Sequence, residues 1–188
     1  MRKLIYSLTA SLDGYIAGPD GAIDWSEPDE ELFRFHHEHV QQLGVHLCGR
    51  RLYETMTYWE TADESPLAAE QVAFAQTWKA LPKIVFSTTL ESVIGNTRLA
   101  TGDVGEDVSR LKERPGKDIG VGGAGLAGTC MKLELIDEWR LFVSPVVLGG
   151  GTPYFPSLES RTRLELIETR TFGSRVVYLR YGRSSDGR

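Results

Sequence analysis

Segments with strand character alternate with segments of helical periodicity along most of the chain. Strands are predicted at residues 2–9, 45–49, 83–88, 97–100 and 118–123. Helices are predicted at residues 27–44, 50–56, 66–79, 105–113 and 124–135. The helix at 27–44 has the clearest signals, since Pro28 and three acids stand at its start and Gly44 at its end. This order of elements predicts a mixed α/β domain.

The last part of the chain follows a different pattern, because it has no helical period. Residues 138–151 and 163–182 are predicted to form antiparallel strands joined by glycine turns. No repeat, low-complexity run or long linker interrupts the sequence, so we expect one domain over residues 1–182. Residues 183–188 are predicted to be a flexible tail.

The composition limits the classes of function. A net charge of −5 and a pI near 5.4 argue against a nucleic-acid groove, which needs a basic surface. No run reaches the roughly 18 to 20 apolar residues that a membrane span needs. The apolar start is too short for a signal peptide, because Ser7, Thr9 and Ser11 interrupt it. Cys48 and Cys130 lie in apolar segments without paired spacing, so we expect a reduced, cytoplasmic protein.

The stretch GVGGAGLAG, residues 120–128, contains the dinucleotide-binding pattern G-x-G-x-x-G twice. A Rossmann site also needs a following strand that ends in an acid, about 20 residues later, to bind the ribose hydroxyls. Here the acids Asp137 and Glu138 stand at the beginning of that strand, and its far end carries Ser144. The sequence therefore excludes a Rossmann site. Two alternatives remain: backbone N–H groups that approach an anion at the helix N-terminus, or close packing of helix on strand.

Two further strand ends carry polar groups. Gly49 ends one predicted strand, and Arg50 and Arg51 place fixed positive charge beside exposed backbone donors. The segment FSTT, residues 86–89, ends another strand with three hydroxyl groups. Together with the glycine-rich stretch, these strand ends predict an elongated ligand with several phosphates, and a dinucleotide has this shape.

Four motifs, in this order, resemble the dihydrofolate reductase-like fold and, within it, the reductase domain of bacterial riboflavin biosynthesis. They are SLTASLDGYIAGPDGAIDW at 7–25, CGRRLYETM at 48–56, GVGGAGLAGTCMKLELIDE at 120–138 and PVVLGGGTPYF at 145–155. The resemblance covers nearly the whole chain. It implies a mostly parallel central sheet with antiparallel C-terminal strands and flanking helices, and NADPH as the cofactor.

The resemblance also implies which residues bind the cofactor. Its phosphates would be contacted by Gly49, Arg50 and Arg51. Its adenosine end, with the 2′-phosphate, would be contacted by Ser87 and Thr88. Its pyrophosphate would be held by Gly122, Gly123, Ala124, Gly125 and Leu126. Its nicotinamide would be lined by Ile16 and Ala17.

On the substrate side, the resemblance matches Trp25 to a substrate-binding loop aromatic, whereas Asp24 stands where dihydrofolate reductases usually have Pro. In those enzymes an acid early in the next helix binds the pterin. Glu30 or Glu31 could correspond to it, and alignment by the apolar positions favours Glu31. The alternative is that acids in a first helical turn serve the helix dipole alone. Protonation of the substrate needs a carboxyl group of raised pKa or an ordered water, and Asp13, Asp24 and Glu31 are the candidate catalytic acids.

The resemblance thus implies an NADPH-dependent reductase acting on a C=N or C=O bond. Its small-molecule substrate would be pterin-like or similar to 5-amino-6-(5-phosphoribosylamino)uracil. The alternative is a nucleotide-binding protein of the same fold without catalytic activity. A ribose phosphate on the substrate calls for basic residues, and Arg34, Lys132 and Arg140 are available without an assigned position.

Two further expectations concern metals and assembly. The histidines of HHEH, residues 36–39, resemble a metal cluster, but a zinc-binding helix needs His at i and i+4, and position 41 is Gln. We therefore expect a polar helix face and no metal. Riboflavin-type reductases generally pair through their C-terminal strands. Because residues 139–148 and 164–181 are apolar-rich and predicted at a sheet edge, we expect a homodimer.

Overall fold

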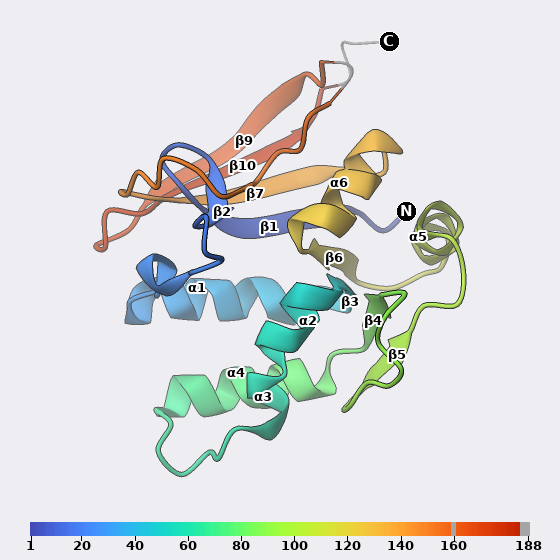
Figure 1. Ribbon diagram of the computed structural model, residues 1–188, viewed down its shortest axis with the longest axis horizontal. Helices are drawn as coiled ribbons and strands as arrows, with labels where there is room; N and C mark the ends of the chain where they lie inside the picture. The colour runs from blue at the N-terminus through green and yellow to red at the C-terminus, as the bar shows by residue number, and fades with distance from the viewer. Residues whose placement is uncertain (159–160, 185–188) are drawn as a thin grey trace.

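The computed structural model describes residues 1–158 and 161–184. Eight strands of these residues form one sheet in the order β5-β4-β3-β6-β1-β7-β10-β9 (Figure 1). Their bounds are β1 Leu4–Ser11, β3 Leu43–Gly49, β4 Lys83–Phe86, β5 Thr97–Leu99, β6 Asp118–Gly122, β7 Glu138–Ser144, β9 Leu164–Thr171 and β10 Val177–Arg183. A second, two-stranded sheet joins β2 Tyr15–Ala17 to β8 Thr152–Pro153.

The large sheet is parallel from β5 through β7, and only its last two strands run antiparallel. Strand β10 pairs antiparallel with β7 on one side and with β9 on the other. The predicted mostly parallel sheet with antiparallel C-terminal strands is therefore confirmed. Since parallel strands all end at one edge, the ends of β3, β4 and β6 lie beside one another there.

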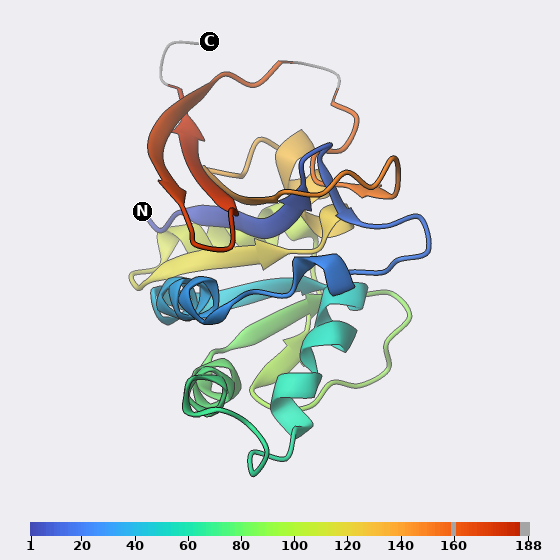
Figure 2. The same ribbon diagram turned by 90° about the vertical axis from the view of Figure 1, so that its left-hand side faces the viewer.

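Helices cover both faces of the sheet. They are η1 Asp24–Ser26, α1 Glu30–Gln41, α2 Arg50–Met56, α3 Tyr58–Thr61, α4 Ala69–Ala80, α5 Val104–Glu113 and α6 Ala124–Lys132. One hydrophobic core joins α5 and α6 to strands such as β1, β3 and β6. On the other face, α1 and α4 lie side by side, and their apolar residues pack with those of α2, β3 and β4 (Figure 2).

Some predicted boundaries were wrong. Helix α1 begins at Glu30 because the Asp29 side chain accepts from the Leu32 N–H, and it ends at Gln41. Gly44 does not end this helix but lies within β3, where an added Cβ would meet the Arg2 side chain at 2.9 Å. The predicted strand at 138–151 ends at Ser144.

The predicted sheet edge also needs correction. Strand β7, in the first predicted edge segment, is not at an edge, because β1 and β10 flank it. In the second segment, only β9 is an edge strand of the sheet. Strand β10 continues to Arg183, and the Ser184 N–H donates to the Arg163 carbonyl at 3.1 Å. The rest of the predicted flexible tail, residues 185–188, lies outside the described residues. In the described part of the chain no helix has the length and apolar character needed to cross a bilayer.

Candidate functional site

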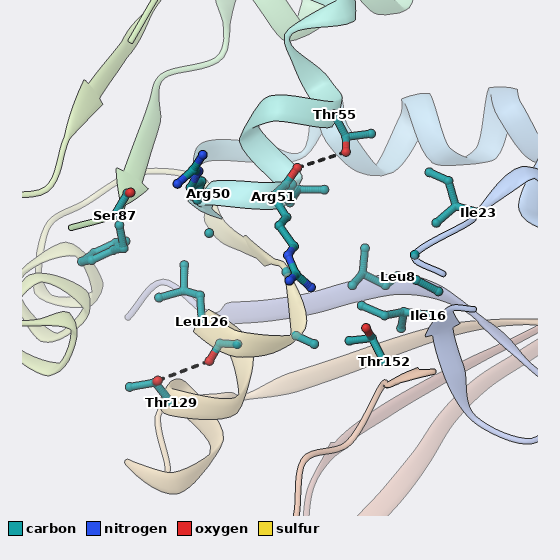
Figure 3. Close-up of a pocket in the computed structure, with 18 of the residues that line it drawn as sticks. Leu8, Ile16, Ile23, Arg50, Arg51, Thr55, Ser87, Leu126, Thr129 and Thr152 are labelled. Atoms are coloured by element: carbon teal, nitrogen blue, oxygen red, sulfur yellow. Dashed lines mark hydrogen bonds between the residues drawn. The ribbon is translucent and has the colours of Figure 1, made fainter. Parts of the chain in front are cut away.

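A cleft with a volume of about 1600 Å³ opens at the carboxyl ends of the parallel strands. This is the edge where ligands bind in open α/β sheets. The cleft draws residues from the ends of β1, β3 and β4, the loop before α5, the first turns of α2 and α6, the segment 16–26 and β8 (Figure 3). Ligand pockets for one small molecule hold roughly 300–1,000 Å³, so this volume suits more than one ligand.

The glycine-rich stretch serves two different purposes. A Cβ on Gly120 would lie 2.7 Å from the His46 ring, and a Cβ on Gly122 would lie 2.2 Å from Leu52 and 3.1 Å from His46. These two glycines therefore make room for the side chains of His46 in β3 and Leu52 in α2, which is the close-packing alternative. Gly122 does not line the cleft.

Gly123 and Gly125 instead leave the N-terminus of α6 open to a ligand. Gly123 has a φ of +90°, and a Cβ there would approach the Gly49 backbone nitrogen at 3.6 Å, so it brings α6 close to the end of β3. Helix α6 then begins at Ala124, and its first N–H groups have no partner within the helix. A Cβ on Gly125 would meet nothing within 4 Å, and this residue lines the cleft. The helix N-terminus thus faces open space that an anion could fill.

The two arginines take different positions in the cleft. The Arg50 Nη1 donates to the Thr89 hydroxyl at 2.7 Å and its Nε pairs with Glu54 at 2.7 Å, so it lies at the end of the cleft that Ser87 occupies. Arg51 extends into the middle of the cleft, between Leu126 and the residues of β1 and β2 (Figure 3). Within the described residues, Arg51 has no ion-pair partner.

The opposite end of the cleft is formed by segments from the two ends of the chain. Leu8, Ile16, Ile23 and Thr152 lie together there (Figure 3). Strand β2 pairs with β8, and the Tyr154 N–H donates to the Gly14 carbonyl at 2.8 Å. A Cβ on Gly151 would lie 2.0 Å from the Ala17 carbonyl oxygen, so only glycine allows this close contact.

Asp13 ties the same two segments together from outside the cleft. Its carboxylate accepts from the Leu148 N–H at 3.1 Å, from the Gly149 N–H at 2.7 Å and from the Ser11 hydroxyl at 2.6 Å. The Ser11 hydrogen bond, with those from Leu148 and Gly149, lowers the pKa of Asp13. A carboxylate in this state holds the loop at 148–149 and is poorly suited to give up a proton near neutral pH.

The other candidate acids also lie outside the residues that line the cleft. Glu31 accepts from Arg170 at 2.8 Å and from the Gly173 N–H at 3.2 Å, and these bonds, the Arg170 bond first, lower the pKa of its carboxyl group. Asp24 is exposed in η1. Trp25 beside it donates to the Ala22 carbonyl at 3.2 Å.

Most of the predicted cofactor residues do come together. With the exception of Gly122, all of them line the cleft: Ile16, Ala17, Gly49, Arg50, Arg51, Ser87, Thr88, Gly123, Ala124, Gly125 and Leu126. The sequence analysis missed several other lining residues, among them Leu8, Thr55, Thr101, Asp103, Thr129 and Thr152. Asp103 carries a signal of its own, since it is the N-cap of α5, but that signal indicates a helix start and not a site.

Two of the three histidines of α1 do not belong to the polar helix face that we expected, whereas His37 lies within 2.8 Å of the Thr77 hydroxyl. His36 packs on Phe142 with ring centroids 4.1 Å apart, and His39 lies near Tyr178 at 5.4 Å. Burial lowers the pKa of His36 to about 4 and is the main cause that lowers the pKa of His39 to about 3. Among residues 1–158 and 161–184, no group of three His, Cys, Asp or Glu side chains is placed to hold a metal ion.

Comparison with known proteins identifies the family to which this chain belongs. The model of the RibD C-terminal domain matches residues 2–178. A curated relative, the uncharacterized protein YyaP of Bacillus subtilis, is 35% identical over 186 residues, which is 96% of this chain and 94% of YyaP. The match therefore covers nearly the whole length of both chains.

Two solved structures share the fold. One is a diaminohydroxyphosphoribosylaminopyrimidine deaminase/5-amino-6-(5-phosphoribosylamino)uracil reductase of Thermotoga maritima, with a TM-score of 0.69 and 18% identity. It matches 97% of this chain, which spans 57% of that longer protein. The other is a dihydrofolate reductase of Enterococcus faecalis complexed with NADP(H), with a TM-score of 0.65 and 13% identity over 97% of both chains.

Proposed function

Because the chain belongs to the family of RibD C-terminal domains, we propose that it is an NADPH-dependent reductase of a small molecule. The observation that carries this proposal is the convergence of the α6 N-terminus, Arg50 and Arg51 in one cleft at the carboxyl ends of the strands. The substrate would carry a C=N or C=O bond in a pterin-like or 5-amino-6-(5-phosphoribosylamino)uracil-like ring.

The cleft suits this dinucleotide for three reasons. A Cβ on Gly125 would meet nothing within 4 Å, so the open space at the α6 N-terminus leaves room for a pyrophosphate. Arg51 reaches the middle of the cleft, where it would neutralise that pyrophosphate (Figure 3). Arg50 lies beside Thr89 and near Ser87, where charge and hydroxyl groups together suit a 2′-phosphate.

When bound, NADPH would supply a hydride to the carbon of the C=N or C=O bond, and the heteroatom of that bond would need a proton from another source. The chain contributes position and exclusion of water. Leu8, Ile16 and Ile23 form an apolar wall for two stacked rings, and Asp13 holds the loop that completes this wall. Since Asp13 and Glu31 both have lowered pKa values, we propose that water delivers the proton.

A second candidate function is binding of a nucleotide without catalysis. The observation that favours this function concerns the possible proton donors. Within the described residues, the carboxylates that line the cleft are Asp20 and Asp103. Asp20 accepts from a backbone N–H group of its own loop and Asp103 from the first turn of α5, so neither carboxylate is free to act as an acid. Under this alternative the cofactor binds and is never oxidised.

One experiment separates the two functions. Calorimetric titration with NADPH and NADH measures binding, and loss of absorbance at the nicotinamide band with a panel of C=N and C=O compounds measures turnover. We expect NADPH to bind at least about tenfold more tightly than NADH, since a charge-assisted contact contributes about 1.5–3 kcal/mol. Equal affinities would contradict the assignment of Arg50 to a 2′-phosphate, and tight binding without turnover by any compound would favour the second function.

We further propose that two copies pair through β9. This border strand is exposed on both faces, and Leu166 and Ile167 are 50% and 48% exposed. A bare strand edge with apolar side chains invites pairing with another copy. Light scattering after size exclusion should give twice the mass of one chain. A cytoplasmic location is also proposed, because Cys48 and Cys130 are both free and buried.

A further inference from the structure

The charged residues of the cleft are few and unevenly placed. Within the described residues, Arg50, Arg51, Asp20 and Asp103 are the charged side chains that line it. Both arginines come from the first turn of α2, directly after β3. Asp103 caps α5 through the Gly105 N–H at 2.7 Å, and Asp20 accepts from the Ala22 N–H at 2.9 Å. The cleft therefore has no net charge, and its positive charge lies at one end and in the middle.

The proposed cofactor would use both positive charges. It carries a 2′-phosphate and a pyrophosphate, and the two arginines lie where these groups would bind. This step rests on the proposed function. Once the cofactor is bound, no arginine of α2 is left to neutralise a further phosphate.

The remaining end of the cleft has a different character. Its walls are apolar at Leu8, Ile16 and Ile23, and the hydroxyl groups of Thr55 and Thr152 lie near them (Figure 3). The Thr55 hydroxyl donates to the Arg51 carbonyl at 3.0 Å and can still accept from an N–H group, whereas the Thr152 hydroxyl can donate or accept, so both suit the polar groups of an uncharged ring. Apolar walls stabilise its faces.

The basic residues that the sequence offered for a substrate phosphate lie elsewhere. Arg34 pairs with Glu30 at 2.7 Å on the exposed side of α1. Arg140 is buried against Glu138 at 2.7 Å. Lys132 is at the last turn of α6, the end opposite to the one that faces the cleft. A phosphate at the substrate end would therefore lose its water without gaining a counter-charge.

From these positions we infer that the substrate is an uncharged, unphosphorylated planar compound with a C=N or C=O bond. Of the two substrate classes considered above, this excludes compounds that carry a ribose phosphate. Recognition would come from ring contacts and from the hydroxyls of residues such as Thr55 and Thr152, with no ion pair.

The test measures binding and not turnover. NADP⁺ is first titrated into the protein by calorimetry, and failure to bind would contradict the proposed function itself. Ribose 5-phosphate is then titrated into free protein and into protein saturated with NADP⁺. We expect any binding to the free protein to require Arg51 and to fall at least about tenfold on saturation, because the cofactor occupies the same charges.

Two outcomes decide the inference. Loss of ribose 5-phosphate binding on saturation, or its absence in both states, supports an unphosphorylated substrate. Retention of the same affinity in the saturated protein would overturn the inference while leaving the cofactor assignment intact. Arg51→Ala and Arg34→Ala serve as a matched pair, since Arg34 is an exposed arginine already paired with Glu30 outside the cleft. Only Arg51→Ala should weaken ribose 5-phosphate binding to the free protein.

Discussion

The protein contains two groups of arginines that differ in what neutralises them. On the α1 side of the sheet, Arg140 and Arg180 surround Glu138, whose side chain is 1% exposed. Arg180 donates to both carboxylate oxygens, at 2.8 and 3.0 Å. In the cleft, Arg51 has no ion-pair partner within the described residues, and Arg50 is held only by the exposed Glu54 and by Thr89.

This difference separates structural charge from charge that is available to a ligand. Burial alone would raise the pKa of Glu138, but hydrogen bonds and charges of Arg180 and Arg140 lower it below its ordinary value. Arg140 and Arg180 thus satisfy a buried acid, whereas the arginines of the cleft have capacity left for phosphate. The sequence shows both groups as basic residues in or after strands, so only the structure distinguishes them.

The largest effect should follow from breaking the buried group. Glu138→Gln leaves Arg140 buried without a counter-charge and should lower the free energy of unfolding by about 3–5 kcal/mol. Urea denaturation measures this change. The affinity of the folded protein for NADP⁺ should remain that of the wild type. A loss of NADP⁺ affinity without loss of stability would contradict the distinction between structural and ligand-binding arginines.

Lowering the pH should also reduce the stability of the protein, through buried histidines that lie outside the cleft. Burial lowers the pKa of His36 and of His46 to about 4 and is the main cause that lowers the pKa of His39 to about 3. The unfolded chain binds these protons near its ordinary pKa of about 6.5, so stability is lost as the pH falls from there toward 4. At about pH 5.5 the loss should be about 1 kcal/mol for each histidine, measured by thermal unfolding across pH. A stability that stays constant from about pH 7 to about pH 5 would contradict the burial of these rings.

In the cleft, Arg51→Ala should do the opposite of Glu138→Gln. An exposed arginine contributes little to the fold, so stability should change by less than about 0.5 kcal/mol. NADP⁺ binding should weaken by about 1.5–3 kcal/mol, because a charge-assisted hydrogen bond is lost. Calorimetry and melting curves of the same samples check both values, with Arg34→Ala as the control.

The smallest effects should come from two glycines of one stretch. Gly122→Ala should destabilise the protein by about 1–3 kcal/mol, since its Cβ would press on Leu52 and His46. Gly125→Ala has no such contact, so stability should be unchanged or rise by up to about 1 kcal/mol. Only Gly125→Ala should weaken NADP⁺ binding, because its methyl group narrows the approach to the α6 N-terminus. If both variants destabilised equally, the division between packing and binding glycines would be wrong.

The sequence predicted the architecture well because local signals and fold agreed. Strand ends with glycine, arginine or hydroxyl residues correctly indicated a shared cleft, since each of these residues lies close to the end of its own strand. Gly122 was assigned to binding because a G-x-G pattern cannot show that His46 and Leu52 occupy the space beside it.

The end of the cleft that we propose for the substrate was harder to predict, also because the sequence does not show spatial neighbours. Candidate acids were chosen by position in the chain, but Glu31 is engaged by Arg170 and Asp13 by Leu148 and Gly149, all more than a hundred residues away. Such long-range partners leave no mark on the local sequence. The hydroxyls at Thr55 and Thr152 likewise come from segments that only the fold brings together.

The contact between Gly151 and the Ala17 carbonyl also bears on how the cleft comes into existence during folding. It joins segments separated by most of the chain, together with the β2–β8 pairing and the hydrogen bonds of Asp13. Closing so long a loop is entropically unfavourable until the rest of the sheet is in place. On the ribosome, the apolar wall therefore cannot close until residues 148–154 have emerged, after the strand ends and the α6 N-terminus that form the rest of the cleft.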